Sequence, residues 1–200
     1  ERIVRSGRGW AWNPTMLLGL ELDGATLGIV GMGRIGMAVA RRAQGFGMVV
    51  VYAESIPRPE ADALGARRME LAELLATSDI VTIHVALTDQ TRHLIGEGAL
   101  RLMKPTAYVV NTSRGPVIDE AALARALNEG WIAGAGLDVY EHEPQVEPAL
   151  LELENVVLLP HLGSATTRTR SEMSRVAATN LAAALNGTRP PNIVNPEVLD

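Results

Sequence analysis

The 200-residue sequence has no cysteine, which excludes disulfides, thiolate nucleophiles and cysteine-ligated metal sites. It has no apolar run near the ~20 residues that a membrane-spanning helix needs, and no signal-peptide pattern at its start. It also lacks a basic run, and its net charge of −5 argues against a nucleic-acid or anionic-membrane partner. We therefore expect a cytoplasmic protein with neither kind of partner.

Core-forming residues, in contrast, are plentiful. Hydrophobic residues make up 47% of the sequence and charged residues 20%, which is typical of a globular chain long enough for one domain with a real core. The chain begins with Glu1 instead of methionine, and its first residues resemble the end of a structural element. We therefore expect it to be a piece of a longer polypeptide.

The most informative stretch runs over residues 26–36. A short apolar run at 27–30 predicts a buried strand, and Gly31-Met-Gly33-Arg-Ile-Gly36 follows at once. This is a G-x-G-x-x-G motif between a strand and a helix, the context in which it indicates dinucleotide binding. Gly31 permits the tight turn, Gly33 lets the backbone approach a pyrophosphate, and Gly36 lets the helix pack close to the strand.

The predicted helix after the glycines offers the second half of a phosphate site. Its first residues, Arg34 and Ile35, present free N–H groups and a partial positive charge, which favour an anion. One face of this helix carries apolar residues, which we expect to pack on the sheet: Ile35, Val39, Ala43 and Phe46.

Predicted strands and helices alternate along the rest of the chain. Further strands are expected over 48–52, 63–68, 79–87, 107–111, 132–139 and 156–159. Helices are expected over 69–77, 99–103 and 119–130, the last capped by Asp119. A long final helix, capped by Ser164 or Thr166 and closed by Gly187, carries apolar residues that we expect to face inward: Met173, Val176, Leu181 and Leu185. Alternation of this kind predicts an α/β fold with a doubly wound parallel sheet, the Rossmann type.

Ligands of such sheets bind at the carboxyl ends of the strands, so residues just after each strand are the candidates for chemistry. Glu54 lies about 20 residues beyond the glycine motif, where a carboxylate accepts hydrogen bonds from the adenosine ribose. It would repel a 2′-phosphate, which favours NAD, although Arg58 nearby leaves NADP open. His84 is placed to line the cofactor site without doing chemistry, and Thr112 and Asp138 are further cofactor-site candidates.

Three charged residues after other strands suit hydride transfer between a nicotinamide and a carbonyl. Arg114 could grip a substrate carboxylate bidentately, and His161 could give the accompanying proton. Glu143 could orient that histidine and raise its pKa, with Asp138 supporting the pair. Taken singly, each has an ordinary structural interpretation as a loop cap, a turn residue or a loop histidine. The upstream cofactor motif favours the functional interpretation for the set.

Two other kinds of site are not expected. The four histidines are scattered without ligand-type spacing, which argues against a metal site. Ser113 has no nearby base, so a hydrolase is not supported.

Four segments together resemble the D-isomer-specific 2-hydroxyacid dehydrogenases in order and spacing. They are residues 27–36, 111–116, 137–144 and 160–166. The chain looks most like the glyoxylate/hydroxypyruvate reductase branch. The resemblance implies an oxidoreductase acting on a small 2-oxo acid, in which Arg114 binds substrate, His161 is the acid/base, Glu143 is its partner and Asp138 is a supporting carboxylate.

The sequence departs from the family in three respects. Ala86 stands where the family usually has proline, and Ala53 stands where NAD-using members usually have aspartate, so the cofactor preference is open. Roughly 100 residues that form most of a substrate-binding domain in the family are also absent. The resemblance thus implies a dinucleotide-binding domain over residues 1–187 and a strap over 188–200 that would return to the missing domain.

Alternatives exist for both function and assembly. The chain could be an NAD-binding interaction module like the corepressor relatives of the family, or a cofactor-binding fragment that is inactive on its own. The resemblance also implies a homodimer formed through the cofactor domain. Trp10 and Trp12 lie on an arm that suits a subunit contact. The other interpretation is that both indoles pack on the body of their own chain.

Overall fold

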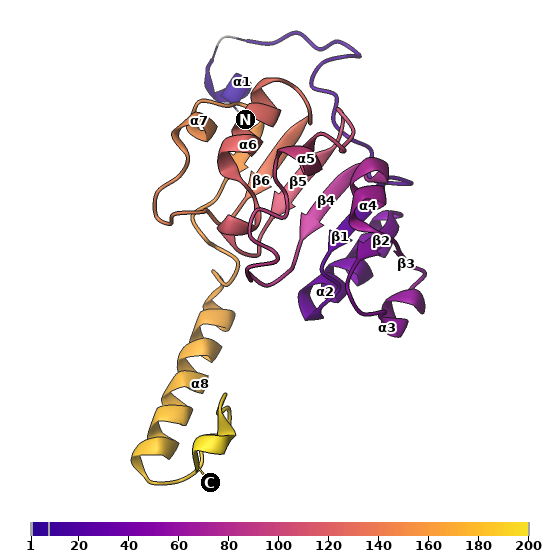
Figure 1. Cartoon of the computed structure of the whole chain (residues 1–200). Helices are drawn as coiled ribbons and strands as arrows, with labels where there is room; N and C mark the ends of the chain where they lie inside the picture. Colours follow the sequence, from indigo (N-terminus) through magenta and orange to yellow (C-terminus); the bar gives the residue numbers. More distant parts are fainter. Residues whose placement is uncertain (1, 8, 200) are drawn as a thin grey trace.

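The computed structural model describes residues 2–7 and 9–199, and its centre is a seven-stranded sheet (Figure 1). The sheet has the order β3-β2-β1-β4-β5-β6-β7, and every neighbouring pair is parallel. The strands are β1 (Thr26–Val30), β2 (Val49–Ala53), β3 (Arg67–Arg68), β4 (Ile80–Ile83), β5 (Tyr108–Asn111), β6 (Gly134–Leu137) and β7 (Val156–Leu158). The predicted doubly wound fold is confirmed, with strands shorter than expected.

Helices cover both faces of the sheet. The helices are α1 (Arg2–Arg5), α2 (Arg34–Ala43), α3 (Pro59–Asp62), α4 (Leu71–Thr77), α5 (Glu97–Leu100), α6 (Glu120–Asn128), α7 (Pro148–Leu151) and α8 (Thr167–Leu185). Single turns such as α1, α3 and α7 are too short to show an apolar period, so the sequence does not predict them.

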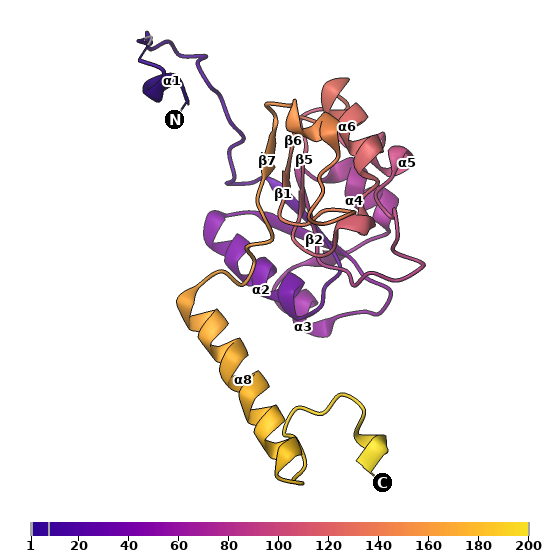
Figure 2. The same ribbon diagram turned by 90° about the vertical axis from the view of Figure 1, so that its left-hand side faces the viewer.

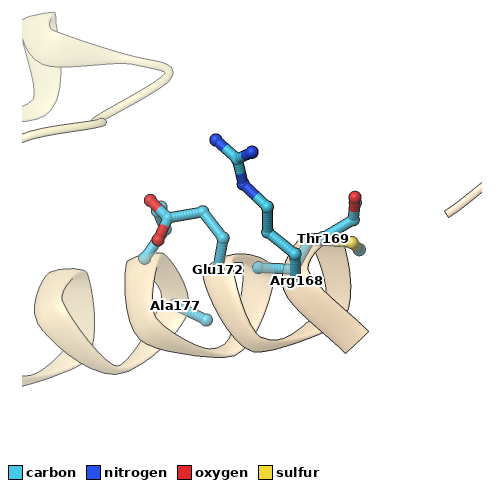
Figure 3. A pocket seen from close by; sticks show the side chains of 6 residues that line it. Arg168, Thr169, Glu172 and Ala177 are labelled. Atoms are coloured by element: carbon cyan, nitrogen blue, oxygen red, sulfur yellow. The ribbon is translucent and has the colours of Figure 1, made fainter. Parts of the chain in front are cut away.

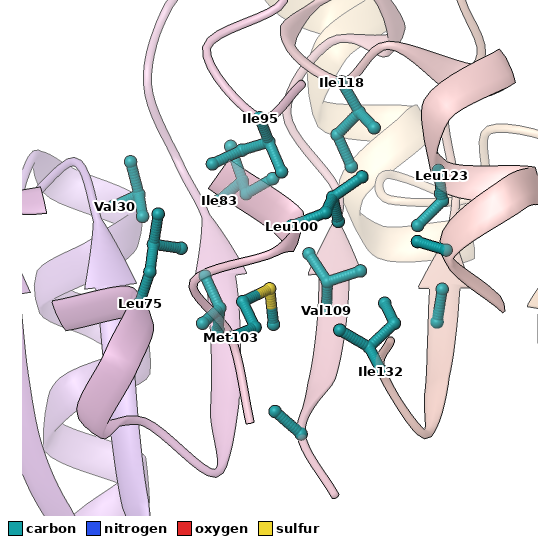
Figure 4. Close-up of a cluster of buried hydrophobic side chains, with 14 of the residues drawn as sticks. Val30, Leu75, Ile83, Ile95, Leu100, Met103, Val109, Ile118, Leu123 and Ile132 are labelled. Carbon is teal, nitrogen blue, oxygen red and sulfur yellow. The ribbon is translucent and has the colours of Figure 1, made fainter. Parts of the chain in front are cut away.

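Two apolar clusters fill the space between the helices and the sheet. One lies under α2 and α3 and includes Ile29 and Tyr52, both fully buried. The other joins β4, β5 and β6 to α4, α5 and α6, and Figure 4 shows its side chains meeting across the strands. Because each face has its own cluster, β1 and β4 are buried from both sides and can carry continuous apolar runs, whereas β5 and β7 have residues such as Tyr108 and Val157 that are not buried.

Helix α2 packs on the sheet through three small residues and one methionine. Its buried residues are Gly36, Met37, Ala40 and Ala43. Ile35 is 64% exposed and Phe46 is 60% exposed, so the expectation that these two side chains face the sheet is wrong. A Cβ at Gly36 would collide with the carbonyl oxygen of Gly31. The start of the helix therefore lies too close to the strand end to accept a large side chain.

Helix α8 projects away from the sheet (Figures 1 and 2). None of its side chains, all of which the structure describes, is buried, and Met173, Leu181 and Leu185 are exposed. The expectation that they face inward is therefore wrong for this chain. Within residues 2–7 and 9–199, no helix is both long enough and apolar enough to cross a bilayer.

The two ends of the chain also lie away from the sheet. The last residues fold back beside α8, where the Asn192 N–H donates to Asn180 Oδ1 at 2.9 Å. Whether they act as a strap stays a prediction. Trp10 and Trp12 are exposed on an extended arm, so the interpretation that their indoles pack on the body is wrong. A subunit contact through this arm stays a prediction.

Removal of the N-cap side chain should lower the free energy of unfolding by different amounts in α6 and α8. Asp119 accepts the Ala122 N–H at 2.9 Å, and Thr166, not Ser164, caps α8 by accepting the Thr169 N–H at 3.1 Å. Because α6 is packed in the core, Asp119→Ala should lower the free energy of unfolding of this chain by about 1 kcal/mol. Thr166→Ala should leave it nearly unchanged, since α8 projects away from the sheet and none of its side chains is buried. Urea unfolding followed by circular dichroism measures both, and equal effects would contradict this account.

Candidate active site

The predicted site residues meet at one edge of the sheet because parallel strands end there together. Val30 pairs with Ala53 of β2 and with Ile83 of β4, so the segments after β1, β2 and β4 lie side by side. Asn111, Leu137 and Leu158 align in the same way at the ends of β5, β6 and β7. The edge therefore has a cofactor half and a second half that carries the acid–base candidates.

The glycine motif has a different task at each position. Gly31 has φ +96°, and a Cβ there would lie 2.8 Å from the backbone of His84 and Val85. Gly33, in contrast, would present a Cβ to open space, with no described atom within 4 Å. The loop therefore leaves room for a bound group above Gly33, directly at the N-terminus of α2.

That helix start suits an anion. Gly33 is the N-cap of α2, and none of the described side chains caps the helix. The first N–H groups of a helix have no partner within it, so those of Arg34 and Ile35 are positioned to bind a phosphate. The Arg34 side chain is exposed. A dinucleotide pyrophosphate fits these features.

Glu54 lies next to this loop. Its Oε2 accepts the backbone N–H of Met32 at 3.1 Å, and its Oε1 accepts the Ser55 N–H at 3.0 Å. Arg58 Nη2 lies 3.7 Å from the same carboxylate. A cavity of about 380 Å³ opens beside it, lined partly by Glu54, Ser55 and Val85. The carboxylate is therefore held at the end of β2, where a ribose would lie.

The other two predicted cofactor contacts differ in burial. His84 is half-buried, and its Nε2 lies 3.1 Å from Thr82 Oγ1. Burial lowers the pKa of His84, so its imidazole is neutral near pH 7. Thr112 is exposed in the loop after β5. His84 thus contributes an uncharged wall beside Gly31.

His161 and Glu143 form a hydrogen-bonded pair. His161 Nδ1 lies 2.9 Å from Glu143 Oε2, and Glu143 Oε1 accepts the Tyr140 N–H at 3.0 Å. Their side chains are 52% and 37% exposed, so the pair lies at the surface of this chain. The hydrogen bond from His161 lowers the pKa of Glu143, assisted by the Tyr140 N–H and the charge of Arg114. The pair therefore contributes stability above the ordinary carboxyl pKa and loses it as pH falls through the lowered value.

Asp138 and Tyr140 hold the loop that carries His161, each through one hydrogen bond to its backbone. Asp138 is buried, and its Oδ1 accepts the Leu162 N–H at 2.6 Å. The Tyr140 hydroxyl donates to the Leu159 carbonyl at 2.9 Å. His161, between these two contacts, has φ +54°, a conformation that persists only where its surroundings fix it. Asp138 thus contacts the loop that carries His161, and its cofactor contact stays a prediction.

Arg114 lies on the neighbouring loop, which is pressed against the Glu143 segment. A Cβ at Gly115 would collide with the Tyr140–Glu141 peptide group. Asn111 braces the loop from within, since its Nδ2 donates to the Arg114 carbonyl at 3.0 Å. The guanidinium is exposed, and among the described residues it donates one hydrogen bond, to the Ser113 carbonyl at 2.6 Å. Arg114 therefore has further N–H donors with which it could bind an anionic group near Glu143.

A family model described as D-isomer specific 2-hydroxyacid dehydrogenase, NAD binding domain, matches residues 1–163. The chain belongs to this family. A glyoxylate reductase of Korarchaeum cryptofilum is 56% identical over the whole chain. The crystal structure of the TT0316 protein from Thermus thermophilus has a TM-score of 0.89 at 47% identity and covers 96% of this chain and 60% of that one.

A third similar protein has been solved with the cofactor. It is a D-isomer specific 2-hydroxyacid dehydrogenase from Lactobacillus delbrueckii ssp. bulgaricus in its NAD complexed form, with a TM-score of 0.82, 31% identity and coverage of 97% of this chain and 62% of that one. This chain spans 61% of the length of the K. cryptofilum relative. The chain is thus similar over its whole length to about three fifths of these relatives, the part that includes the NAD-binding domain of the family.

A hollow of about 550 Å³ lies elsewhere in the chain, along α8. Figure 3 shows that its walls are side chains of that helix alone, including Arg168, Thr169 and Glu172. A surface walled by one helix is an open flank, and none of the predicted site residues lines it. It is therefore not the active-site candidate.

Some residues of the candidate site are missing from the sequence-based prediction. Tyr140 and Asn111 hold the two loops through hydrogen bonds, and Gly115 allows the loops to touch. Their position one or two residues from Asp138, Arg114 and the strand ends is the only signal in the sequence. Closeness in sequence indicates that these residues lie near the site, but it does not indicate which atoms are in contact.

Gly115→Ala should disturb the site more than the sheet. Its methyl group must displace the Tyr140–Glu141 peptide, so we expect a cost of about 1–3 kcal/mol in unfolding free energy and a displaced Glu143. Gly98→Ala is the matched control, since a Cβ at Gly98 would meet no described atom within 4 Å. Urea unfolding and amide chemical shifts of residues 138–147 report the two effects. Unchanged shifts in a stable Gly115→Ala protein would contradict the close packing.

Proposed function

We propose that this domain belongs to an NAD-dependent reductase of small 2-oxo acids, with glyoxylate or hydroxypyruvate as the favoured substrate. The observation that carries the proposal is the 2.9 Å contact between His161 Nδ1 and Glu143 Oε2, at the sheet edge that also presents Arg114. The relatives named glyoxylate reductase support the substrate class.

Each charged residue has one task in this reaction. Glu143 holds Nδ1 of His161, which leaves Nε2 as the nitrogen that gives a proton to the substrate carbonyl oxygen. Arg114 binds the substrate carboxylate and polarises the adjacent carbonyl. Asp138 fixes the backbone of the histidine loop. A bound nicotinamide cofactor would supply the hydride, and the proton from His161 would complete the 2-hydroxy acid.

The cofactor would be held by the glycine motif and by Glu54. The α2 N-terminus would bind the pyrophosphate through the N–H groups of Arg34 and Ile35. Glu54, which already accepts the Met32 N–H, would accept the ribose hydroxyls and disfavour a 2′-phosphate. We therefore propose NAD over NADP.

An interaction module is the competing function, and it gives the His161–Glu143 contact no role. We propose in addition that the 200-residue chain alone binds the dinucleotide and turns over little, because the substrate domain of its relatives is not part of it. We also propose a cytoplasmic location and a homodimer formed through the cofactor domain, a contact that the Trp10–Trp12 arm would suit.

Replacement of the acid–base pair tests the proposed reaction. In the longest natural polypeptide that carries this sequence, His161→Gln should lower kcat by about 10²- to 10⁴-fold, because no other group gives the proton. Arg114→Ala should raise KM for the oxo acid. His142→Gln and Arg41→Ala, both exposed, are matched controls. NADH absorbance with glyoxylate, hydroxypyruvate and pyruvate is the readout. Consumption of none of the three, or an Arg114→Ala enzyme like the wild type, would refute the assignment.

Replacement of Glu54 tests the cofactor preference separately. Glu54→Ala should weaken NADH binding about tenfold and narrow the preference over NADPH, since the ribose loses its acceptor and Arg58 loses its partner. Glu60→Ala, an exposed change on α3, is the control. Calorimetric titration of the 200-residue chain with NADH and NADPH needs no turnover. Equal affinities in the wild type would show that Glu54 does not discriminate.

A further inference from the structure

Glu120 is a buried carboxylate that the proposed reaction does not use. It is the first residue of α6, directly after the Asp119 cap, and it is 5% exposed. Its two oxygens are both engaged by backbone: Oε1 accepts the Glu141 N–H at 2.5 Å, and Oε2 accepts the Glu147 N–H at 3.3 Å. A carboxylate at this position therefore joins two points six residues apart.

The segment between those points carries Glu143. Its turn is closed by backbone pairing of His142 with Gln145, and Glu143 itself reaches the Tyr140 N–H at one end. Glu120 thus binds the segment on both sides of the residue that holds His161. Because the segment lies outside helix and strand, it has no ladder of its own to fix it.

Other contacts converge on the same end of the segment. The Glu141 carboxylate lies 2.5 Å from His93 Nε2, and Gly115 packs directly on the Tyr140–Glu141 peptide. Glu147 is the N-cap of α7, so the other end continues into a short helix. Glu120 is the one side chain among the described contacts that binds both ends.

Only a carboxylate satisfies this arrangement. It offers two acceptor oxygens, whereas glutamine offers one acceptor and would turn an NH₂ group toward the second N–H. An apolar residue would leave both backbone donors without an acceptor in a buried place. Glutamate at position 120 is therefore the residue that can accept both the Glu141 and the Glu147 N–H groups.

We propose that Glu120 is a positioning residue that holds the 141–147 segment and thereby fixes Glu143 against His161. The proposal rests on the proposed function, since it assigns Glu120 a part in the same proton transfer. Glu120 touches no reacting atom and acts through Glu143 alone.

The raised pKa of Glu120 helps to distinguish a positioning role from a contribution to the stability of the folded chain. Burial raises the pKa of Glu120, with the Glu141 and Glu147 carboxylates adding to that effect and their backbone N–H groups opposing it. Ionised Glu120 is therefore costly to the folded state near pH 7. Glu120→Gln removes that cost but turns an NH₂ group toward one of the two N–H donors, and because these two effects oppose each other we expect a thermal midpoint close to that of the wild type.

The first experiment needs no turnover. In the 200-residue chain labelled with ¹³C at glutamate carboxyls, the Glu143 signal, assigned by its loss in Glu143→Gln, should titrate below the ordinary value of about 4.3. In Glu120→Gln its midpoint should move toward that value, because the segment no longer presents Glu143 to His161 and the Tyr140 N–H. Glu60→Gln removes the same charge from α3 and should leave the Glu143 midpoint in place.

The second experiment measures turnover in the longest natural polypeptide that carries this sequence. Glu120→Gln should lower kcat about tenfold with KM for NADH unchanged, since misplacement of a catalytic group by a fraction of an ångström lowers the rate by that order. Glu120→Ala, which removes both acceptors, should lower kcat further.

The outcomes are distinct. A folded Glu120→Gln protein with the wild-type Glu143 midpoint overturns the positioning role. Weaker NADH binding together with a lower thermal midpoint also overturns it, since Glu120 would then support the fold in general. If the wild type reduces no 2-oxo acid while the Glu143 midpoint still moves in Glu120→Gln, the proposed function fails and the structural part of the inference stands.

Discussion

Parallel pairing on both sides of β1 is the constraint on which the rest of the structure depends. The strands β2 and β3 lie on one side of β1, and β4 to β7 lie on the other. In a sheet of this topology the connecting helices on the two sides of this point cover opposite faces, and ligands bind between them at the carboxyl ends of the strands. The same pairing aligns the ends of all the strands. Residues that are more than a hundred positions apart in the sequence, such as Gly31 and His161, therefore face the same edge without any contact between them.

Acidic side chains then position the loops at that edge. Glu54, Asp138, Glu143 and Glu120 each accept at least one backbone N–H, from Met32, Leu162, Tyr140 and Glu141 respectively. A loop has no hydrogen-bonded ladder of its own, so a carboxylate with two acceptor oxygens is an efficient way to fix its path. The excess of acidic residues thus has a structural use apart from solvation.

The sequence predicts those parts of the molecule that depend on local pattern. The strand–glycine–helix unit, the sheet and the strand-end positions of Arg114, Glu143 and His161 follow from short-range regularities. The inward face of α2 does not, because close packing to a strand selects alanine and glycine over Ile35. The predicted burial of α8 is wrong for another reason: the helix projects away from the sheet, so Met173, Leu181 and Leu185 are exposed. Glu120 looks like an ordinary first-turn glutamate, since nothing local indicates that the Glu141 backbone lies beside it.

The three glycines of the motif are required for different reasons, so their presence is not in every case evidence of nucleotide binding. Gly31 and Gly36 are fixed by neighbouring backbone, so any protein with this strand-to-helix turn must keep them, whatever it binds. Gly33 faces open space, so the fold alone places no restriction on it. Among related sequences, the middle glycine is therefore the position whose loss would record that a lineage has given up its nucleotide while keeping its architecture.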